Sequence, residues 1–257
     1  MTPGDSVILV TGGAGGLGEA TARHLHGLGG HVVLFDLDEV RAKAVCDALG
    51  DRADYIVGDG TDEEESRRSV DYAGSLGQLR GVVATAGGGT ASSRTVQRDG
   101  TPHDLQLFRD TLELNVVTTF NTVRFAAAHM AALSPCTDDG ERGAIVLTGS
   151  VAGFEGQIGQ LAYAAAKAAV HGMTIALARD LAVSGVRVNT IAPGTMDTRA
   201  WEVADPAVKS ALEARVPFPQ RFGAPAEFAD LAAHLLTNGY MNGHVVRLDG
   251  AIRFGPK

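Results

Sequence analysis

Tyr163 and Lys167 stand four residues apart, and Ser150 lies thirteen residues before Tyr163 at the end of an apolar run. On a helix, positions i and i+4 share a face, so the Lys167 ammonium can lie near the Tyr163 phenol and favour its ionised form. A tyrosine tuned in this way can exchange a proton near neutral pH. Accidental spacing is the alternative, but the tyrosine and lysine counts predict only about 0.06 such pairs by chance. The spacing therefore indicates proton-transfer chemistry.

A glycine-rich turn at residues 11–18 joins the first apolar run to a helical pattern. Glycines let such a turn close tightly, let the backbone approach a pyrophosphate, and leave the amides at the helix N-terminus free to face its charge. The strand–turn–helix context makes a dinucleotide site a strong prediction, and a tight turn without a ligand is the alternative. The residues expected at this site are Gly12, Gly15, Gly16, Leu17 and Gly18.

Acidic and small residues follow the next three apolar runs. Asp36 ends the second run, where a carboxylate can accept hydrogen bonds from an adenosine ribose and repel a 2′-phosphate, which favours NAD over NADP. Its alternative role is to cap the helix that follows. Asp59 and Gly60 after the third run, and Ala86 and Gly87 after the fourth, are placed to border the adenine and the ribose on the pyrophosphate side. Each pair could also be ordinary turn chemistry.

Short apolar runs alternate with longer helical patterns along the chain. Strands are predicted at residues 6–11, 31–36, 53–58, 81–86, 144–150, 186–191 and 245–249, and helices at 18–28, 38–49, 62–76, 105–133, 160–183, 206–214 and 225–237. The β-branched runs are nearly continuous, as a parallel sheet covered on both faces requires. We therefore predict an α/β fold with a single domain over residues 1–257, in which helices cover both faces of a Rossmann-like, doubly wound parallel sheet of about seven strands.

Composition narrows the class of partner. The formal charge is −8, which argues against nucleic acid and favours a small molecule. Cys46, Cys136 and the eight histidines show no metal-ligand spacing, so no metal site is predicted. Two cysteines suggest reduced thiols in a reducing compartment, and the sequence shows neither a targeting segment nor an apolar run of about 18 residues. We expect a cytoplasmic location and no membrane association.

The glycine turn together with Ser150, Tyr163 and Lys167 resembles the short-chain dehydrogenase/reductase family. The order of that family is also followed by Asp59, Ala86, Gly87, Asn115, Asn189, Pro193 and Gly194, so the resemblance covers the whole chain. Residues 154–160, 216–219 and 247–253 are similar to the type II 3-hydroxyacyl-CoA dehydrogenase subgroup, also called 17β-hydroxysteroid dehydrogenase type 10. The polar loops at 88–103 and 134–142 have counterparts in that subgroup.

The resemblance implies a mechanism that these side chains can perform. Tyr163 would remove the proton of a secondary hydroxyl while a hydride passes to NAD, and in reduction it would return that proton. Because the ordinary pKa of tyrosine is near ~10, Lys167 and the nicotinamide charge would have to favour the phenolate. Ser150 would hold the substrate oxygen. Asn115 would anchor a water that relays protons to Lys167, although a helical asparagine can instead bond a neighbouring carbonyl.

By the same resemblance, the segment after Pro193 contacts the nicotinamide side of the cofactor through Thr195, Met196 and Thr198. Gln157 and Gln160 lie between Ser150 and Tyr163, where their side chains could meet an acyl group.

One departure from many relatives is visible at residues 83–87. Relatives carry asparagines before the Ala-Gly pair, whereas this chain has Ala84 and Thr85. We expect Thr85 to supply part of the polar contact that stabilises the end of the strand. The loop at 88–103 follows the same strand, where it could either cover a substrate or be a surface insertion.

The predicted helix at 160–183 is apolar nearly all round. A helix buried on one side should carry a polar stripe, so this one is expected to pack against a second subunit as well as its own sheet. The resemblance implies a homotetramer.

Three functions are compatible with these residues. The first is an NAD-dependent oxidoreductase of secondary alcohols and ketones, above all 3-hydroxyacyl-CoA and 3-oxoacyl-CoA. The second is a hydroxysteroid or other short-chain alcohol dehydrogenase with the same machinery. The third is an NAD-binding sensor without turnover, against which the intact set of Ser150, Tyr163 and Lys167 argues.

Overall fold

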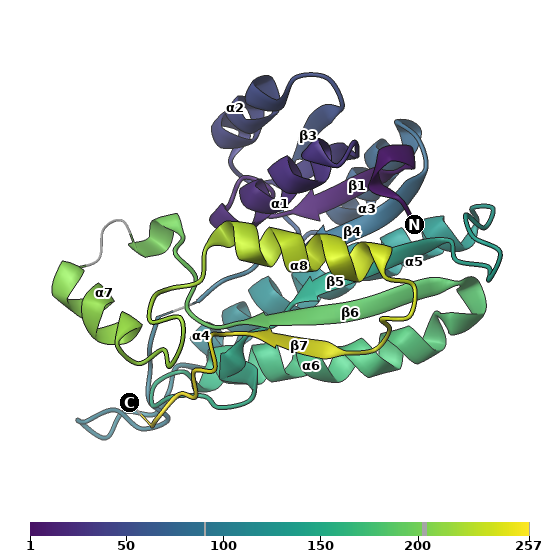
Figure 1. Ribbon diagram of the computed structural model, residues 1–257. Coiled ribbons are helices and arrows are strands. Elements are labelled where there is room, and N and C mark those ends of the chain that lie inside the picture. Colours follow the sequence, from purple (N-terminus) through teal and green to yellow (C-terminus); the bar gives the residue numbers. More distant parts are fainter. Residues whose placement is uncertain (90, 202–204, 257) are drawn as a thin grey trace.

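Seven parallel strands form one sheet in the computed structural model, which describes residues 1–89, 91–201 and 205–256. The strands are β1 (Val7–Thr11), β2 (His31–Asp36), β3 (Ala53–Val57), β4 (Leu79–Ala84), β5 (Gly143–Thr148), β6 (Val186–Pro193) and β7 (Val245–Leu248). Their order is β3-β2-β1-β4-β5-β6-β7, with all neighbours parallel (Figure 1). The order reverses between β1 and β4, the switch point beyond which such sheets bind ligands.

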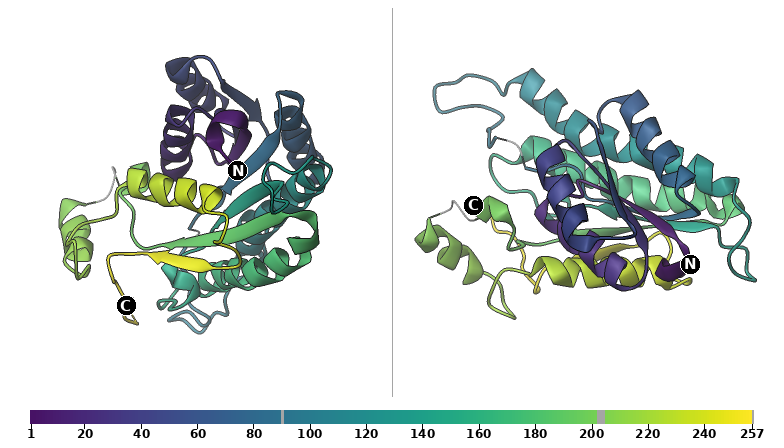
Figure 2. Two further views of the ribbon diagram at one scale, coloured as in Figure 1. Left: turned by 45° about the vertical axis from the view of Figure 1, so that its right-hand side comes forward. Right: turned by 90° about the horizontal axis from the view of Figure 1, so that it is seen from above.

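Helices connect the strands and cover both faces of the sheet. They are α1 (Gly16–Gly27), α2 (Glu39–Leu49), α3 (Glu63–Ser75), α4 (Leu105–Leu112), α5 (Thr118–Ala131), α6 (Leu161–Asp180), α7 (Pro206–Glu213) and α8 (Pro225–Thr237), with 3-10 turns at Pro3–Asp5, Val151–Gly153, Ala182–Ser184 and Arg199–Trp201. α1 and α8 pack together on one face, and α3, α5 and α6 cover the other (Figures 1 and 2). The predicted Rossmann-like, doubly wound fold is confirmed.

Alternate residues of each central strand enter two separate apolar cores. Ile8 and Val10 of β1 pack on the α1 and α8 side, whereas Val7 and Leu9 pack on the α3 and α5 side. Both sets are buried. Since successive strand side chains point to opposite faces, burial of both faces requires the continuous apolar runs seen in the sequence.

Aspartates mark the starts of four helices. Asp38, Asp62, Asp104 and Asp205 each accept a hydrogen bond from a first-turn amide of α2, α3, α4 and α7. This is the N-cap arrangement that satisfies otherwise unpaired amides. α1 differs, because its N-cap is Gly15 and no side chain bonds its first-turn amides.

The continuous helix predicted at 105–133 is interrupted. A π-helical turn, Glu113–Val117, separates α4 from α5. Apolar periodicity continues through this segment, so the extra residue in the turn could not be predicted from it. Such turns occur frequently at functional sites.

The sequence was expected to contain no apolar run of about 18 residues, the length needed to span a membrane. By length and composition that expectation was wrong. Among the described residues, α6 is long and apolar enough to do so, because its alanine content raises its hydropathy. Core helices pass the same test, and α6 packs along β6 with Val170 and Ala178 in the core. Its Leu161 and Ile175 are exposed.

The two long loops lie at opposite ends of the strands, one at the carboxyl edge of the sheet and the other at the amino edge. The loop at 88–103 follows β4 at the carboxyl edge, and its Ser93 amide donates to the Gly159 carbonyl at 2.9 Å. The loop at 134–142 precedes β5 at the amino edge, where Glu141 pairs with Arg187 and with the Met1 amino group. Only the first loop is therefore placed to cover a ligand of the carboxyl edge.

Candidate active site

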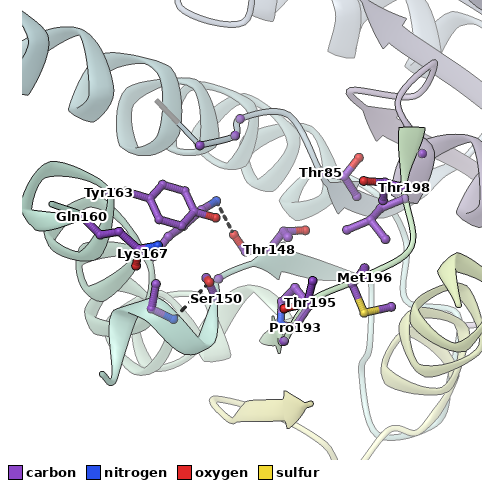
Figure 3. Close-up of a pocket in the computed structure, with 18 of the residues that line it drawn as sticks. Thr85, Thr148, Ser150, Gln160, Tyr163, Lys167, Pro193, Thr195, Met196 and Thr198 are labelled. Atoms are coloured by element: carbon purple, nitrogen blue, oxygen red, sulfur yellow. Dashed lines mark hydrogen bonds between the residues drawn. The ribbon is translucent and has the colours of Figure 1, made fainter. Parts of the chain in front are cut away.

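A cavity of about 650 Å³ opens at the carboxyl ends of β1, β4, β5 and β6 (Figure 3). Of the predicted site residues, those that line it are Gly12, Gly15, Gly16, Leu17, Gly18, Gly87, Ser150, Gln157, Gln160, Tyr163, Lys167, Thr195, Met196 and Thr198. Residues from five separate stretches of the chain are thus brought to one space. Asp36, Asp59, Gly60, Ala86 and Asn115 are not among the lining residues.

Lys167 and Tyr163 lie side by side on α6, as the spacing predicted. The Lys167 ammonium donates to the main-chain oxygen of Thr148 at 3.0 Å and lies 5.7 Å from the centroid of the Tyr163 ring (Figure 3). Lys167 is buried, and burial lowers its pKa to about 8. The lysine therefore remains largely cationic at pH 7.

The expected lowering of the tyrosine pKa is not seen in this structure. Burial raises the pKa of Tyr163, and a hydrogen bond with the Ser150 side chain offsets only part of that rise. The phenol is consequently held in its neutral form. The prediction overlooked desolvation, which disfavours the phenolate before any cationic ligand enters the site.

Ser150 is fixed at the point where β5 turns toward α6. It is extended, precedes the 3-10 turn Val151–Gly153, and its Oγ accepts a hydrogen bond from the Ala152 amide at 3.1 Å. A hydroxyl that accepts from the backbone keeps its own hydrogen free to donate. Ser150 can therefore donate to an oxygen in the cavity, such as that of Tyr163, with which its side chain shares a hydrogen bond.

The glycine turn is shaped as a phosphate site requires. Gly12 has a positive φ of 64°, and a Cβ there would lie 2.8 Å from the Ala86 amide nitrogen. A Cβ on Gly16 would lie 2.9 Å from the Thr198 side chain. With no side chain capping α1, the amides of its first turn are left for an anion. These residues fit the pyrophosphate of a dinucleotide.

Asp36 lies beside this turn, although it does not line the cavity. Its carboxylate accepts hydrogen bonds from the Ala14 amide at 2.9 Å and the Asp38 amide at 3.0 Å. The alternative role as a helix cap is wrong, because Asp38 caps α2. The Asp36 carboxylate is thus held against the turn that would carry the pyrophosphate.

The other predicted cofactor residues have structural contacts. The Asp59 carboxylate accepts from the amide and hydroxyl of Thr61, which is turn chemistry. The Gly60 carbonyl accepts from Ser66. Ala86 lies behind the Gly12 turn and donates its amide to Thr11 Oγ1 at 3.3 Å. Its amide faces β1 in this contact, so Ala86 supports the glycine turn.

Thr85 supplies the contact expected of it. Its hydroxyl donates to the Thr11 carbonyl at 2.7 Å, and its amide donates to the same carbonyl at 3.1 Å. The end of β4 is thereby tied to the end of β1 without the asparagines of many relatives.

Asn115 lies in the π-helical turn and is fully buried. Its Nδ2 donates to the carbonyls of Thr111 and Gly88, at 3.0 and 3.1 Å, and its Oδ1 accepts from the Gly88 amide at 3.0 Å. Asn115 therefore bonds neighbouring carbonyls, which was the alternative to its predicted role in a water relay. These bonds fix Gly88, which lines the cavity.

Around Gln157 and Gln160 the cavity also includes residues that the sequence did not single out. Gln157 and Gln160 line it and bond each other through their side chains. Ser92, Trp201 and Phe254 line it as well. Phe254 lies close to the C-terminus, far from the catalytic motif in sequence, and no spacing pattern connects the two.

No cluster that could hold a metal ion occurs among residues 1–89, 91–201 and 205–256.

Comparison with known proteins agrees with this site. The family model described as short chain dehydrogenase matches residues 6–208. Two curated relatives are both called 3-hydroxyacyl-CoA dehydrogenase type-2. The Drosophila melanogaster protein is 42% identical, covering 98% of this chain and 99% of its own length. The Homo sapiens protein is 42% identical, covering 97% and 96%.

The crystal structure of 3-hydroxyacyl-CoA dehydrogenase type-2 from Mycobacterium avium superposes with a TM-score of 0.94. It is 52% identical in sequence, with 98% of each chain covered. The sequence, the fold and the cavity agree, and the chain belongs to the short-chain dehydrogenase family of oxidoreductases.

Proposed function

We propose that the protein catalyses the NAD-dependent interconversion of 3-hydroxyacyl-CoA and 3-oxoacyl-CoA. The observation that carries the proposal is that Ser150, Tyr163 and Lys167 line the same cavity as the glycine turn. The substrate class comes from the similar proteins, which are named 3-hydroxyacyl-CoA dehydrogenase type-2. Their similarity to this chain extends over nearly their whole length.

A bound nicotinamide dinucleotide would supply or accept the hydride. Gly12, Gly15, Gly16 and the uncapped start of α1 would hold its pyrophosphate, while Met196 and Thr198 would border the nicotinamide side. Asp36 would select NAD, since a carboxylate against the turn repels a 2′-phosphate. Asp59, Gly60 and Gly87 remain our predicted neighbours of the adenosine and the second ribose.

Tyr163 would transfer the proton. Its neutral phenol, maintained by burial, suits donation to a ketone oxygen in the direction of reduction. In the direction of oxidation, positive charge entering the site would favour the phenolate beside a largely cationic Lys167. The Ser150 hydroxyl, with its oxygen already accepting from Ala152, would donate to the substrate oxygen as charge develops there.

The loop at 88–103 is proposed to cover the acyl group. Ser92 lines the cavity, and Ser93 is bonded to Gly159 of the segment that carries Gln157 and Gln160. These two glutamines would then contact the substrate beyond its reacting carbon.

A direct comparison of substrates tests the proposal. The purified protein is given NADH with acetoacetyl-CoA or with a 17-ketosteroid, and NADH absorbance is followed. We expect kcat/KM for acetoacetyl-CoA to exceed that for the steroid by at least about tenfold, and NADPH to support little turnover. Absence of NADH oxidation with every acyl-CoA offered would refute the substrate assignment, and a preference for the steroid would replace it with the alternative.

We also propose that the protein is a homotetramer. Leu161 and Ile175 of α6 and Phe120 of α5 are large apolar side chains left exposed, which is the expected signature of helix faces covered by another subunit. Light scattering on the eluted protein checks this, and the mass of a monomer would contradict it.

A further inference from the structure

His171 is a titratable side chain that the proposed reaction does not use, yet it contacts the backbone of the catalytic serine. It follows Lys167 by one turn of α6, and its Nε2 accepts a hydrogen bond from the Ser150 amide at 3.4 Å. Its ring also packs on Phe154, with 4.4 Å between centroids and an interplanar angle of 35°. His171 therefore touches the residue just before the 3-10 turn Val151–Gly153 and the residue just after it.

Two glycines create the space that the imidazole occupies. A Cβ on Gly149 would lie 2.5 Å from His171 Nε2, and a Cβ on Gly153 would lie 2.6 Å from its Cε1. Both approaches are too close for a side chain, so glycine on either side of Ser150 allows the ring to reach the backbone. The ring is consequently wedged between α6 and the turn.

The bond requires a neutral histidine. An amide can donate only to an imidazole nitrogen that carries no proton. Burial, the Lys167 ammonium and the Arg247 guanidinium all lower the pKa of His171, to about 4. The carboxylates on this side, Glu155 and Asp249, are each paired with Arg247 at 2.6 Å. The acceptor state is thus maintained through the neutral pH range.

We propose that His171 is a positioning residue, whose unprotonated Nε2 holds the Ser150 amide and so fixes the direction of the Ser150 hydroxyl. Ser150 is then held twice, through its amide by His171 and through its Oγ by Ala152. The hydroxyl hydrogen of Ser150 is then available to a substrate oxygen that enters beside Tyr163. The proposal rests on the proposed role of Ser150, and not on the identity of the substrate.

A double-mutant cycle separates positioning from plain structural support. His171→Leu removes the acceptor, and His171→Gln keeps one at comparable reach. With the serine present, we expect His171→Leu to lower kcat by roughly tenfold through misplacement of the hydroxyl, with the NADH dissociation constant unchanged and partial recovery in His171→Gln. In the Ser150→Ala background, where no hydroxyl remains to be positioned, the same change should alter the residual kcat by less than about twofold.

A remote histidine provides the matched control. His129 of α5 packs against Gly74 of α3, so His129→Leu should leave kcat as in the parent protein. Melting temperature and NADH affinity are measured for each variant so that turnover refers to folded enzyme. Equal losses from His171→Leu with and without Ser150, or equal values for the Leu and Gln variants, would overturn the proposal.

The substrate assignment is kept separate by running the cycle with both acetoacetyl-CoA and ethyl acetoacetate, which carries the same ketone without CoA. If only the ester is turned over, the acyl-CoA assignment fails while the cycle still decides the role of His171. If neither is turned over by the parent protein, the role of Ser150 in ketone reduction fails, and the His171 proposal is overturned with it.

Discussion

The Lys167 ammonium is anchored 3.0 Å from the main-chain oxygen of Thr148, the last residue of β5. The bond joins α6 to the strand that leads to Ser150, so one contact fixes the relative position of two elements of the candidate active site. It also places a cation where water has little access, and burial lowers the lysine pKa to about 8.

That buried charge predicts a pH-dependent stability difference for Lys167→Met. The pKa falls from 10.5 to about 8 on folding, so between these pH values the unfolded chain binds more protons and stability rises with pH. Below pH 8 the cost of the buried charge is fully present. The variant should therefore gain most relative to the parent at pH 7, by at most about 3 kcal/mol, and this gain should shrink toward pH 10.

Urea unfolding at pH 7 and pH 10 measures this difference. The lost bond to Thr148 opposes the gain equally at both pH values. Lys209→Met is the control, because Lys209 is paired with Asp197 and its pKa is raised. If the stability difference between Lys167→Met and the parent were independent of pH, the pKa of the buried lysine would not be lowered by folding. Turnover should be lost in this variant at either pH.

The contacts of Asp36 predict a change in cofactor choice for Asp36→Asn. Removing the charge eliminates the repulsion of a 2′-phosphate and weakens the bonds to a ribose diol, so NADH affinity should fall roughly tenfold and NADPH affinity should rise. Both dissociation constants are obtained from fluorescence titration. Asp38→Ala is matched in charge and position, and it should cost about 1 kcal/mol of stability through loss of the α2 cap without changing the cofactor ratio. The same ratio in Asp36→Asn and the parent would contradict the role of Asp36.

The three bonds of Asn115 predict that Asn115→Ala loses both stability and turnover. The variant loses three hydrogen bonds, one of which is fully buried, so the unfolding free energy should fall by about 2 kcal/mol or more. Displacement of Gly88 from the cavity should also lower kcat.

Asn189→Ala is the control for Asn115→Ala. Asn189 is equally buried, and it bonds Met241 and His244 away from the cavity. We expect a comparable stability loss and an unchanged kcat for the folded protein. If Asn115→Ala retained the parent kcat, Asn115 would be only a structural residue.

Prediction from sequence succeeded where local pattern determines structure. β2 has the predicted bounds, His31–Asp36, because its β-branched run stands between two turns. Tyr163 and Lys167 share a face of α6 because their spacing requires it. The π-helical turn at Asn115 could not be predicted, since one extra residue in a turn leaves apolar periodicity almost unchanged.

Contacts between distant segments were also beyond the sequence. The Lys167 bond to Thr148 and the Ser150 bond to His171 depend on how α6 lies against β5, which no spacing specifies. Phe254 reaches the cavity because the segment after β7 returns to it, where the Phe254 amide contacts Glu155. The sign of the tyrosine pKa shift depended on burial, which only the packed structure reveals.

The proton-transfer role of Tyr163 is tested most directly by Tyr163→Phe, which removes one oxygen from the cavity. NADH affinity is titrated, and acetoacetyl-CoA reduction is followed in the variant, the parent and the fully exposed control Tyr240→Phe. We expect NADH affinity to be retained, kcat to fall by at least about 100-fold in Tyr163→Phe, and the control to match the parent. Unchanged turnover in Tyr163→Phe would contradict the central claim.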